Sequence, residues 1–172
     1  MIENIEKIKN HAEKTADKLI EKLKALGLKL ALAESCTAGL VSSLLVNKSG
    51  ASSVLWGSFV CYTQEAKVSM LDIDNNKLDE HGLVSRDTAC SMAEKVLEKS
   101  AADLAASVTG LAGPLGDGSG VPIGTVWIAV AKKDGAIFAK EFNFTGSNEP
   151  LPRNEVRYRA AASVLEELLT VI

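Results

Sequence analysis

Lys29–Gly39 reads KLALAESCTAG, and the order of its residue types is that of a strand, a tight turn and a helix. Residues 29–34 form a short apolar run of the kind found in buried strands. Ser35 and Thr37 follow directly, and both are residue types that commonly cap the N-terminus of a helix. We therefore predict a strand over 29–34 and a helix over about 37–47.

The segments on both sides continue this alternation of helices and strands. The patterns predict further helices at residues 5–26, 64–71, 75–81, 85–99 and from Pro152 onward, and further strands at residues 54–62, 104–108, 124–132 and 136–144. Lys133-Asp134-Gly135 is a hairpin signal between the last two strands. Because apolar strands that do not alternate with polar residues are covered on both faces, we expect one α/β domain over 1–172. Its predicted architecture is a three-layer α/β/α sandwich with a mixed, mostly parallel sheet and a C-terminal β-hairpin followed by a helix.

The composition argues against several classes of protein. The chain of 172 residues has 19 Lys plus Arg against 22 Asp plus Glu and no basic cluster, so we expect no nucleic-acid partner. Its three cysteines have no recognisable spacing, which favours a reducing compartment. The first residues lack a signal-peptide pattern and no apolar run is long enough for a membrane span, so we expect a cytoplasmic protein without a membrane partner.

Ser35 is a candidate nucleophile because it stands where a strand gives way to a helix. At that place its hydroxyl would lie beside free backbone N–H groups, which suits an oxyanion hole. A serine hydroxyl needs a neighbouring base, and His11 and His81 fall on helices away from the expected strand ends. A Ser-His-Asp triad is therefore not expected. The alternative interpretation is that Ser35 only caps a helix.

Lys67 is the candidate base, because it lies early in the helix that follows the second predicted strand. Tyr62 stands at the end of that strand, and either Lys67 or Tyr62 could pass the serine proton to the leaving group. If the two strands are neighbours, the segments after them open at the same edge of the sheet as Ser35. Burial would lower the pKa of the lysine and leave it able to accept a proton. The alternatives are a solvated helix lysine and a core tyrosine ring.

Two further features could contribute to such a site. Cys36 is a competing nucleophile if the helix N-terminus lowers the pKa of its thiol, and otherwise a small buried side chain. Residues 110–124 contain six glycines and two prolines and predict a loop. This loop is either a phosphate cradle, with Thr109, Gly110 and Gly113 as contacts, or an ordinary surface loop. Three arginines of the last helix are further candidates for phosphate binding, with solvated side chains as the alternative: Arg153, Arg157 and Arg159.

Four segments together resemble the C-terminal domain of the CinA family of competence/damage-inducible proteins. They are AESCTAG at 33–39, YTQEAK at 62–67, SVTGLAGP at 107–114 and PIGTVW at 122–127, in the family's order, and the similarity extends over nearly the whole chain. The resemblance implies a nicotinamide-nucleotide amidase, which converts nicotinamide mononucleotide to nicotinic acid mononucleotide and ammonia in pyridine nucleotide salvage. It implies no metal and no organic cofactor.

Carried over by position, the family's serine, tyrosine and lysine are Ser35, Tyr62 and Lys67. We expect substrate contacts at other motif residues: Glu34, Cys36, Thr37, Thr109, Gly110 and Gly113. One departure is Ala38, where the family commonly has a glycine, and an alanine there would be unfavourable if the backbone takes a positive φ. Larger family members carry a further domain associated with pyrophosphatase activity, which we do not expect from these 172 residues.

Two other functions stay open at this stage. The chain could be a non-catalytic nucleotide-sensing or partner-binding module of the same fold, or an amidase for another small carboxamide. Release of ammonia from the mononucleotide would distinguish the first, and a comparison of the mononucleotide with its riboside the second. In each case the expected ligand is a small molecule, and a homo-oligomer remains possible.

Overall fold

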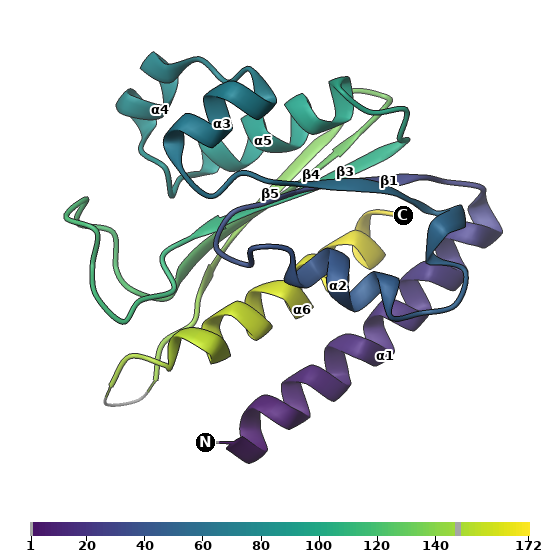
Figure 1. Cartoon of the computed structure of the whole chain (residues 1–172), viewed down its shortest axis with the longest axis horizontal. Coiled ribbons are helices and arrows are strands. Elements are labelled where there is room, and N and C mark those ends of the chain that lie inside the picture. Colours follow the sequence, from purple (N-terminus) through teal and green to yellow (C-terminus); the bar gives the residue numbers. More distant parts are fainter. Residues whose placement is uncertain (1, 147–148) are drawn as a thin grey trace.

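In a computed structural model, residues 2–146 and 149–172 are described, and they form a five-stranded sheet between two layers of helices (Figure 1). The helices are α1 (Ile2–Leu26), α2 (Leu40–Val46), α3 (Gln64–Leu71), α4 (Asn75–His81), α5 (Arg86–Glu98) and α6 (Arg153–Val171), with a short 3₁₀ turn at Ala51–Ser53. The strands are β1 (Leu30–Glu34), β2 (Leu55–Val60), β3 (Leu104–Gly110), β4 (Thr125–Lys132) and β5 (Ile137–Asn143). This sequence of elements is the predicted one.

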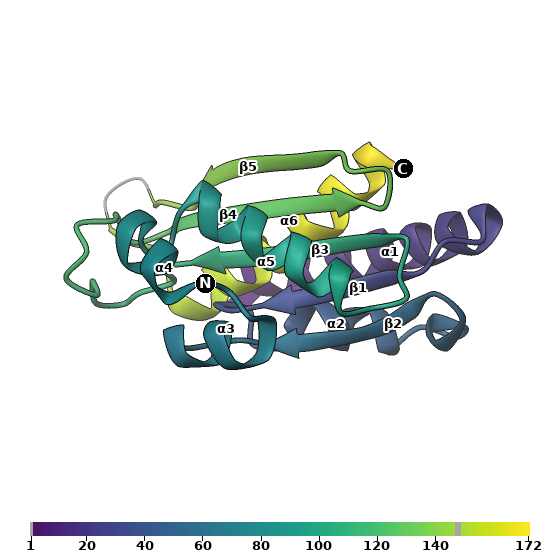
Figure 2. The same ribbon diagram turned by 90° about the horizontal axis from the view of Figure 1, so that it is seen from above.

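The sheet has the strand order β2-β1-β3-β4-β5, which Figure 2 shows from above. β1 pairs in parallel with both β2 and β3, whereas β4 is antiparallel to β3 and to β5. β1, β2, β3 and β5 therefore run in the same direction and β4 runs against them. The predicted mixed, mostly parallel sheet is confirmed, and so is the hairpin of β4 and β5 with a helix after it.

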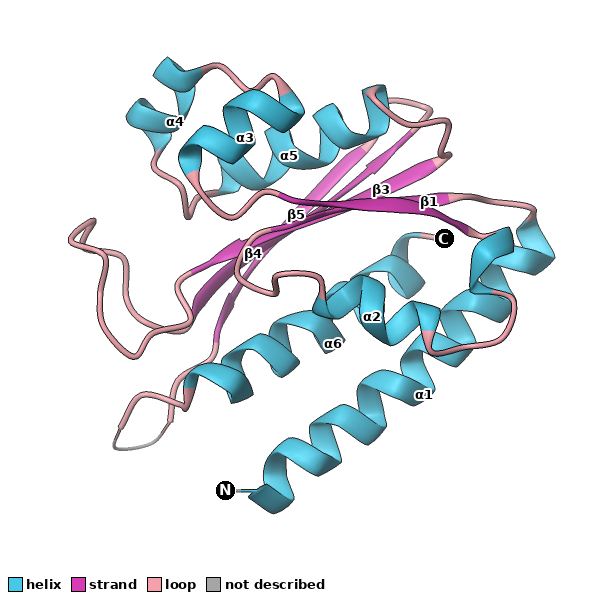
Figure 3. Cartoon of the chain, viewed as in Figure 1, coloured by secondary structure: helices cyan, strands magenta, loops and turns pink. Residues whose placement is uncertain are grey.

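The two faces of the sheet carry side chains of different size. On β1, Leu30 and Leu32 pack with α2 and α6, while Ala31 and Ala33 face the α3–α5 layer. The alternation follows from the period of two residues in a strand. α1 packs on α6 and α2 and forms the outer surface of that layer (Figure 3).

The C-terminal end of α1 differs from the prediction at one residue. The apolar spacing of the helix predicts Leu26 on its buried face, but Leu26 is 52% exposed. Gly27 has a φ of 66°, the Leu28 N–H donates to Leu23 O and the Gly27 N–H donates to Lys24 O. These two bonds make a Schellman motif, in which the residue after the glycine packs back on the helix. Leu28 therefore packs, partly buried, against the core that Leu26 does not reach.

The start of α2 also differs from the prediction. The helix begins at Leu40 rather than near Thr37, because Ala38 and Gly39 have φ values of 50° and 88° and interrupt the helical path. Neither Ser35 nor Thr37 caps the helix. The carboxylate of Glu34 does so instead, accepting from the N–H groups of Val41 at 3.1 Å and Ser42 at 2.9 Å. Residues 35–39 form a turn, which we call the Ser35 turn.

The parallel arrangement brings three connecting segments to one end of the sheet. The Ser35 turn, residues 61–63 and the glycine-rich loop 111–124 follow β1, β2 and β3, at the left in Figure 1. The carboxyl ends of parallel strands are where open α/β sheets bind ligands. Within the described ranges, no helix has the length and apolar character needed to cross a membrane.

Candidate functional site

A cavity of about 220 Å³ opens at this end of the sheet. Its walls come from all three connecting segments, from the end of β3, from α3, from the α4–α5 connection and from the start of α6. The wall residues are Ser35, Cys36, Tyr62, Lys67, Leu83, Val84, Thr109, Gly110, Leu111, Ala112, Asp117 and Arg153. A larger cavity of about 560 Å³ lies along β4 and β5, and neither Ser35 nor Lys67 reaches it. The smaller cavity is therefore the one that contains both Ser35 and Lys67.

Ser35 and Lys67 are in direct contact. The Lys67 Nζ lies 3.1 Å from the Ser35 Oγ and 2.9 Å from the Cys61 carbonyl oxygen. Lys67 is 1% exposed and Ser35 is 7% exposed. The contact depends on the start of α3, where the Thr63 hydroxyl caps the helix by accepting from the Ala66 N–H at 3.1 Å. Lys67 belongs to the first turn after that cap, next to the end of β1.

Burial is the main reason why the pKa of Lys67 is lowered from its usual value of 10.5. Among the described residues no carboxylate forms an ion pair with it, and its two polar partners are a hydroxyl and a carbonyl. A neutral amine can donate one N–H to Cys61 O while its lone pair accepts from the Ser35 hydroxyl. This is the arrangement that a general base requires.

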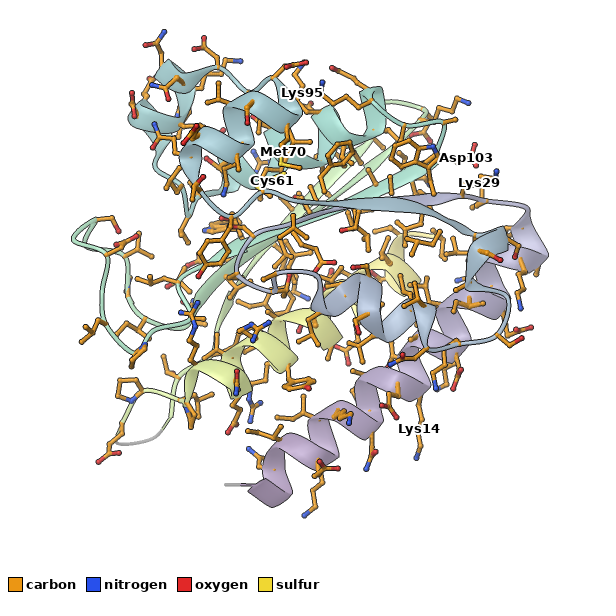
Figure 4. The ribbon with its side chains drawn as sticks, viewed as in Figure 1. Lys14, Lys29, Cys61, Met70, Lys95 and Asp103 are labelled. Carbon is orange, nitrogen blue, oxygen red and sulfur yellow. The ribbon has the colours of Figure 1, made fainter. Side chains whose placement is uncertain are left out.

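The thiols near the pair are not activated. Burial raises the pKa of Cys36 to about 12 and that of Cys61 to about 11. Cys61 lies between the sheet and α3 (Figure 4). Because the thiolate is the reactive form of cysteine, a raised pKa argues against Cys36 as the nucleophile and favours its alternative interpretation as a buried apolar side chain.

The Ser35 turn leaves backbone donors beside the serine. The Ser35 N–H donates to Val108 O at 3.0 Å, and the Ala38 N–H donates to Ser35 O at 3.0 Å. The N–H groups of Cys36 and Thr37 have no oxygen acceptor among residues 2–146 and 149–172. Cys36 belongs to the cavity wall, whereas Thr37 is fully buried. An N–H group next to a nucleophile and without an oxygen acceptor is the donor that an oxyanion hole needs, and the Cys36 N–H meets this requirement.

Tyr62 and Arg153 line the outer part of the cavity. Arg153 donates to the Tyr62 hydroxyl oxygen at 2.6 Å and to Gly113 O at 2.5 Å, so it links α6 to two of the connecting segments. Tyr62 is 51% exposed. Arg157 donates instead to Thr37 O at 2.9 Å, and Arg159 pairs with the buried Glu155. Of the three arginines considered for phosphate binding, Arg153 is the one in the cavity wall.

Three residues expected to contact substrate lie outside the cavity wall. The Glu34 carboxylate is 1% exposed and bonded to α2, and the Thr37 hydroxyl donates to Glu34 Oε2 at 2.8 Å. Both side chains are therefore engaged inside the protein. The carbonyl of Gly113 accepts from Arg153, and a Cβ at this glycine would lie 2.7 Å from Ile123 Cγ2. Gly113 is explained by packing of its own loop.

Cys36, Thr109 and Gly110 do line the cavity, and the last two also have contacts within the protein. The Thr109 hydroxyl donates to Leu83 O at 2.7 Å. A Cβ at Gly110 would lie 2.8 Å from Thr125 O and 2.7 Å from a methyl of Val126. The glycine is therefore required by the close approach of β4.

The backbone at residue 38 has the positive φ that makes an alanine unfavourable there. Ala38 has a φ of 50°, in the region that disfavours side chains with a Cβ. Sequence reasoning did not identify Leu83, Val84 or Asp117 as wall residues. Leu83 and Val84 carry no chemical signal, and only the packing of α4 and α5 beside β3 brings them to the cavity.

Comparisons with known proteins find related sequences and structures. The profile of the CinA C-terminal domain family matches residues 12–172. A CinA-like protein of Syntrophomonas wolfei is 39% identical over 83% of this chain and 33% of its own length. The chain spans about a third of the length of the curated relatives it matches.

Two solved structures have the same fold over almost their full length. The crystal structure of a competence/damage inducible protein from Agrobacterium tumefaciens is 35% identical, with a TM-score of 0.88, and the match covers 94% of this chain and 95% of that one. A CinA-superfamily protein from Escherichia coli is 31% identical, with a TM-score of 0.87 and coverage of 94% and 90%.

Proposed function

This chain belongs to the CinA C-terminal domain family, and from that premise we propose that it is an amidohydrolase acting on nicotinamide mononucleotide. The products are nicotinic acid mononucleotide and ammonia. The observation that carries the proposal is the 3.1 Å contact between the Ser35 Oγ and the buried Lys67 Nζ. A nucleophile next to a base with a lowered pKa is the minimum that serine-dependent amide hydrolysis needs.

In the proposed acylation step, the Ser35 Oγ attacks the carboxamide carbon and Lys67 takes the hydroxyl proton. The carbonyl oxygen becomes an oxyanion, which the Cys36 N–H stabilises. The protonated Lys67 then gives its proton to the amide nitrogen. The C–N bond breaks, ammonia leaves, and the acyl group remains on Ser35 as an ester.

Deacylation reverses these roles. Water attacks the ester carbon while Lys67 accepts one of its protons, and the Cys36 N–H again stabilises the oxyanion. The bond from the carbonyl carbon to Ser35 Oγ breaks as Lys67 returns the proton to the serine. The acid product is released and the enzyme is regenerated.

Tyr62 and Arg153 have supporting roles in this proposal. The Tyr62 oxygen already accepts a hydrogen bond from Arg153, so its own O–H is available to a group in the cavity. Arg153 carries a guanidinium at the cavity wall, suited to the phosphate of a mononucleotide. A phosphate-dependent site predicts that the mononucleotide is turned over in strong preference to its riboside.

The decisive experiment compares Ser35→Ala with the wild type in ammonia release and in nucleotide binding. Loss of the nucleophile is expected to reduce turnover by about a thousandfold or more. Binding, measured by thermal shift, should persist. Retention of about a tenth of wild-type turnover would contradict the assignment of Ser35. Binding without ammonia release by the wild type would favour a nucleotide-sensing module.

A further inference from the structure

Glu34 is the most highly bonded buried acid at the site, although it lies outside the cavity wall. Its Oε2 accepts from the Thr37 hydroxyl at 2.8 Å and from the Val41 N–H at 3.1 Å. Its Oε1 accepts from the Ser42 N–H at 2.9 Å and from the Ser58 hydroxyl at 3.3 Å. All four partners are donors, so the carboxylate has no oxygen left over for a substrate.

These bonds join the two ends of the Ser35 turn. Glu34 is the last residue of β1, which precedes the turn, and Val41 and Ser42 belong to the first turn of α2, which follows it. Thr37 is in the middle. The carboxylate therefore holds the beginning, middle and end of a short segment that contains the nucleophile and the Cys36 N–H.

The backbone of this turn needs such support because it is not regular. Ala38 and Gly39 both have left-handed conformations, and α2 has no side-chain cap from the residue directly before it. An alanine in that region costs about 1 kcal/mol relative to its preferred conformations. Without the carboxylate, the first N–H groups of α2 would also lose their acceptors.

We propose that Glu34 is a positioning residue, which holds the Ser35 turn so that the serine hydroxyl meets Lys67 and the Cys36 N–H faces the developing oxyanion. The inference rests on the proposed amidase function. It assigns to Glu34 a role in turnover without contact to substrate, whereas a substrate-binding role would appear in KM.

Glu34→Gln is a sharp test because glutamine has the same shape. Each carboxylate oxygen accepts from one backbone N–H, Val41 on Oε2 and Ser42 on Oε1. A glutamine has one oxygen, so in either orientation its NH₂ group faces one of these N–H groups, donor to donor. The turn must move to relieve that contact.

The matched control is Asp74→Asn. Asp74 also caps a short helix, α4, but it bonds only the Asn76 N–H at 2.9 Å and lies outside the cavity wall. An asparagine can keep that single bond. Both variants thus neutralise a capping carboxylate, and only one of them disturbs the Ser35 turn.

The experiment measures kcat and KM for ammonia release from nicotinamide mononucleotide, with unfolding monitored by circular dichroism. Since small displacements of reacting groups reduce rates by up to about a hundredfold, Glu34→Gln should lower kcat by about tenfold to a hundredfold and leave KM within about twofold. Asp74→Asn should keep the wild-type kcat. A normal kcat in folded Glu34→Gln, a change confined to KM, or an equal loss in Asp74→Asn would overturn the proposal.

A second readout separates this inference from the function on which it rests. Phenylmethylsulfonyl fluoride sulfonylates an activated serine, as an O–S bond forms and fluoride leaves, and mass spectrometry follows the reaction at Ser35. Glu34→Gln should slow this reaction even if the wild type proves inactive on the nucleotide, and an unchanged rate would count against positioning. If Glu34→Gln does not fold, Thr37→Val removes one donor to the carboxylate. It should lower kcat by about threefold, the effect of losing one modest hydrogen bond, and an unchanged kcat would refute the inference.

Discussion

Replacement of Lys67 by methionine should make the protein more stable while it abolishes turnover. The amine is 1% exposed and no carboxylate of the described residues pairs with it, so folding takes it out of water without electrostatic compensation. Methionine has a similar unbranched length and no charge to desolvate. The burial that destabilises the charged form of Lys67 is thus also what makes its amine able to act as a base.

The magnitude follows from the contacts of the amine. If Lys67 is wholly neutral at pH 7, its burial costs at most about 5 kcal/mol, the free energy needed to deprotonate a lysine of ordinary pKa 10.5 at that pH. Methionine loses the two hydrogen bonds of Nζ, worth about 1 kcal/mol each. We therefore expect Lys67→Met to unfold with a free energy higher by about 1 to 3 kcal/mol, and with a Tm higher by roughly 3 to 10 °C.

The pH dependence of the stability difference shows whether burial of the Lys67 charge is its cause. Between the lowered pKa of folded Lys67 and 10.5, the unfolded wild type binds more protons than the folded one, so wild-type stability rises with pH. Methionine does not titrate, so Lys67→Met lacks this contribution to the pH dependence of stability. The stability advantage of Lys67→Met should be fully present below the folded pKa and should shrink as the pH approaches 10.5.

Urea unfolding at a series of pH values measures this difference, and Lys77→Met, at an exposed lysine of α4, is the control that should show no trend. Ammonia release by Lys67→Met should fall by about a hundredfold or more, because general base catalysis is lost. A Lys67→Met protein less stable than the wild type at pH 7, or an advantage independent of pH, would refute the reasoning.

Two further substitutions test neighbouring parts of the site. Cys36→Ala should keep most of the wild-type turnover, and thiol alkylation should leave the wild-type rate unchanged. The reason is that burial raises the pKa of this thiol to about 12. Loss of ammonia release on alkylation of Cys36 would restore it as the nucleophile. Gly110→Ala should lower the free energy of unfolding by about 1 to 3 kcal/mol, because its Cβ would overlap with Thr125 O and Val126. An unchanged Tm would contradict this and show that β4 can move away without loss of stability.

The order of elements was predictable because it depends on local patterns. Apolar periodicity placed each helix and strand, Ser85 was predicted to begin α5 and does accept from the Thr88 N–H, and the β4–β5 hairpin follows its turn residues. Errors occurred where capping was not local. The start of α2 was misplaced because its acceptor is Glu34, six residues before the helix begins, and a side chain before a turn gives no sign of which way it points.

By itself, the sequence determined that a serine stands at the end of an apolar strand and that a lysine follows the next strand by a short interval. Both are consequences of chain connectivity and of the periods of helix and strand. Only the tertiary structure decided that β1 and β2 are parallel neighbours, that Lys67 is buried against Ser35, and that Glu34 supports the turn rather than the substrate. Burial and strand pairing are sums over contacts between residues distant in sequence, and the pKa of an amine depends on that burial.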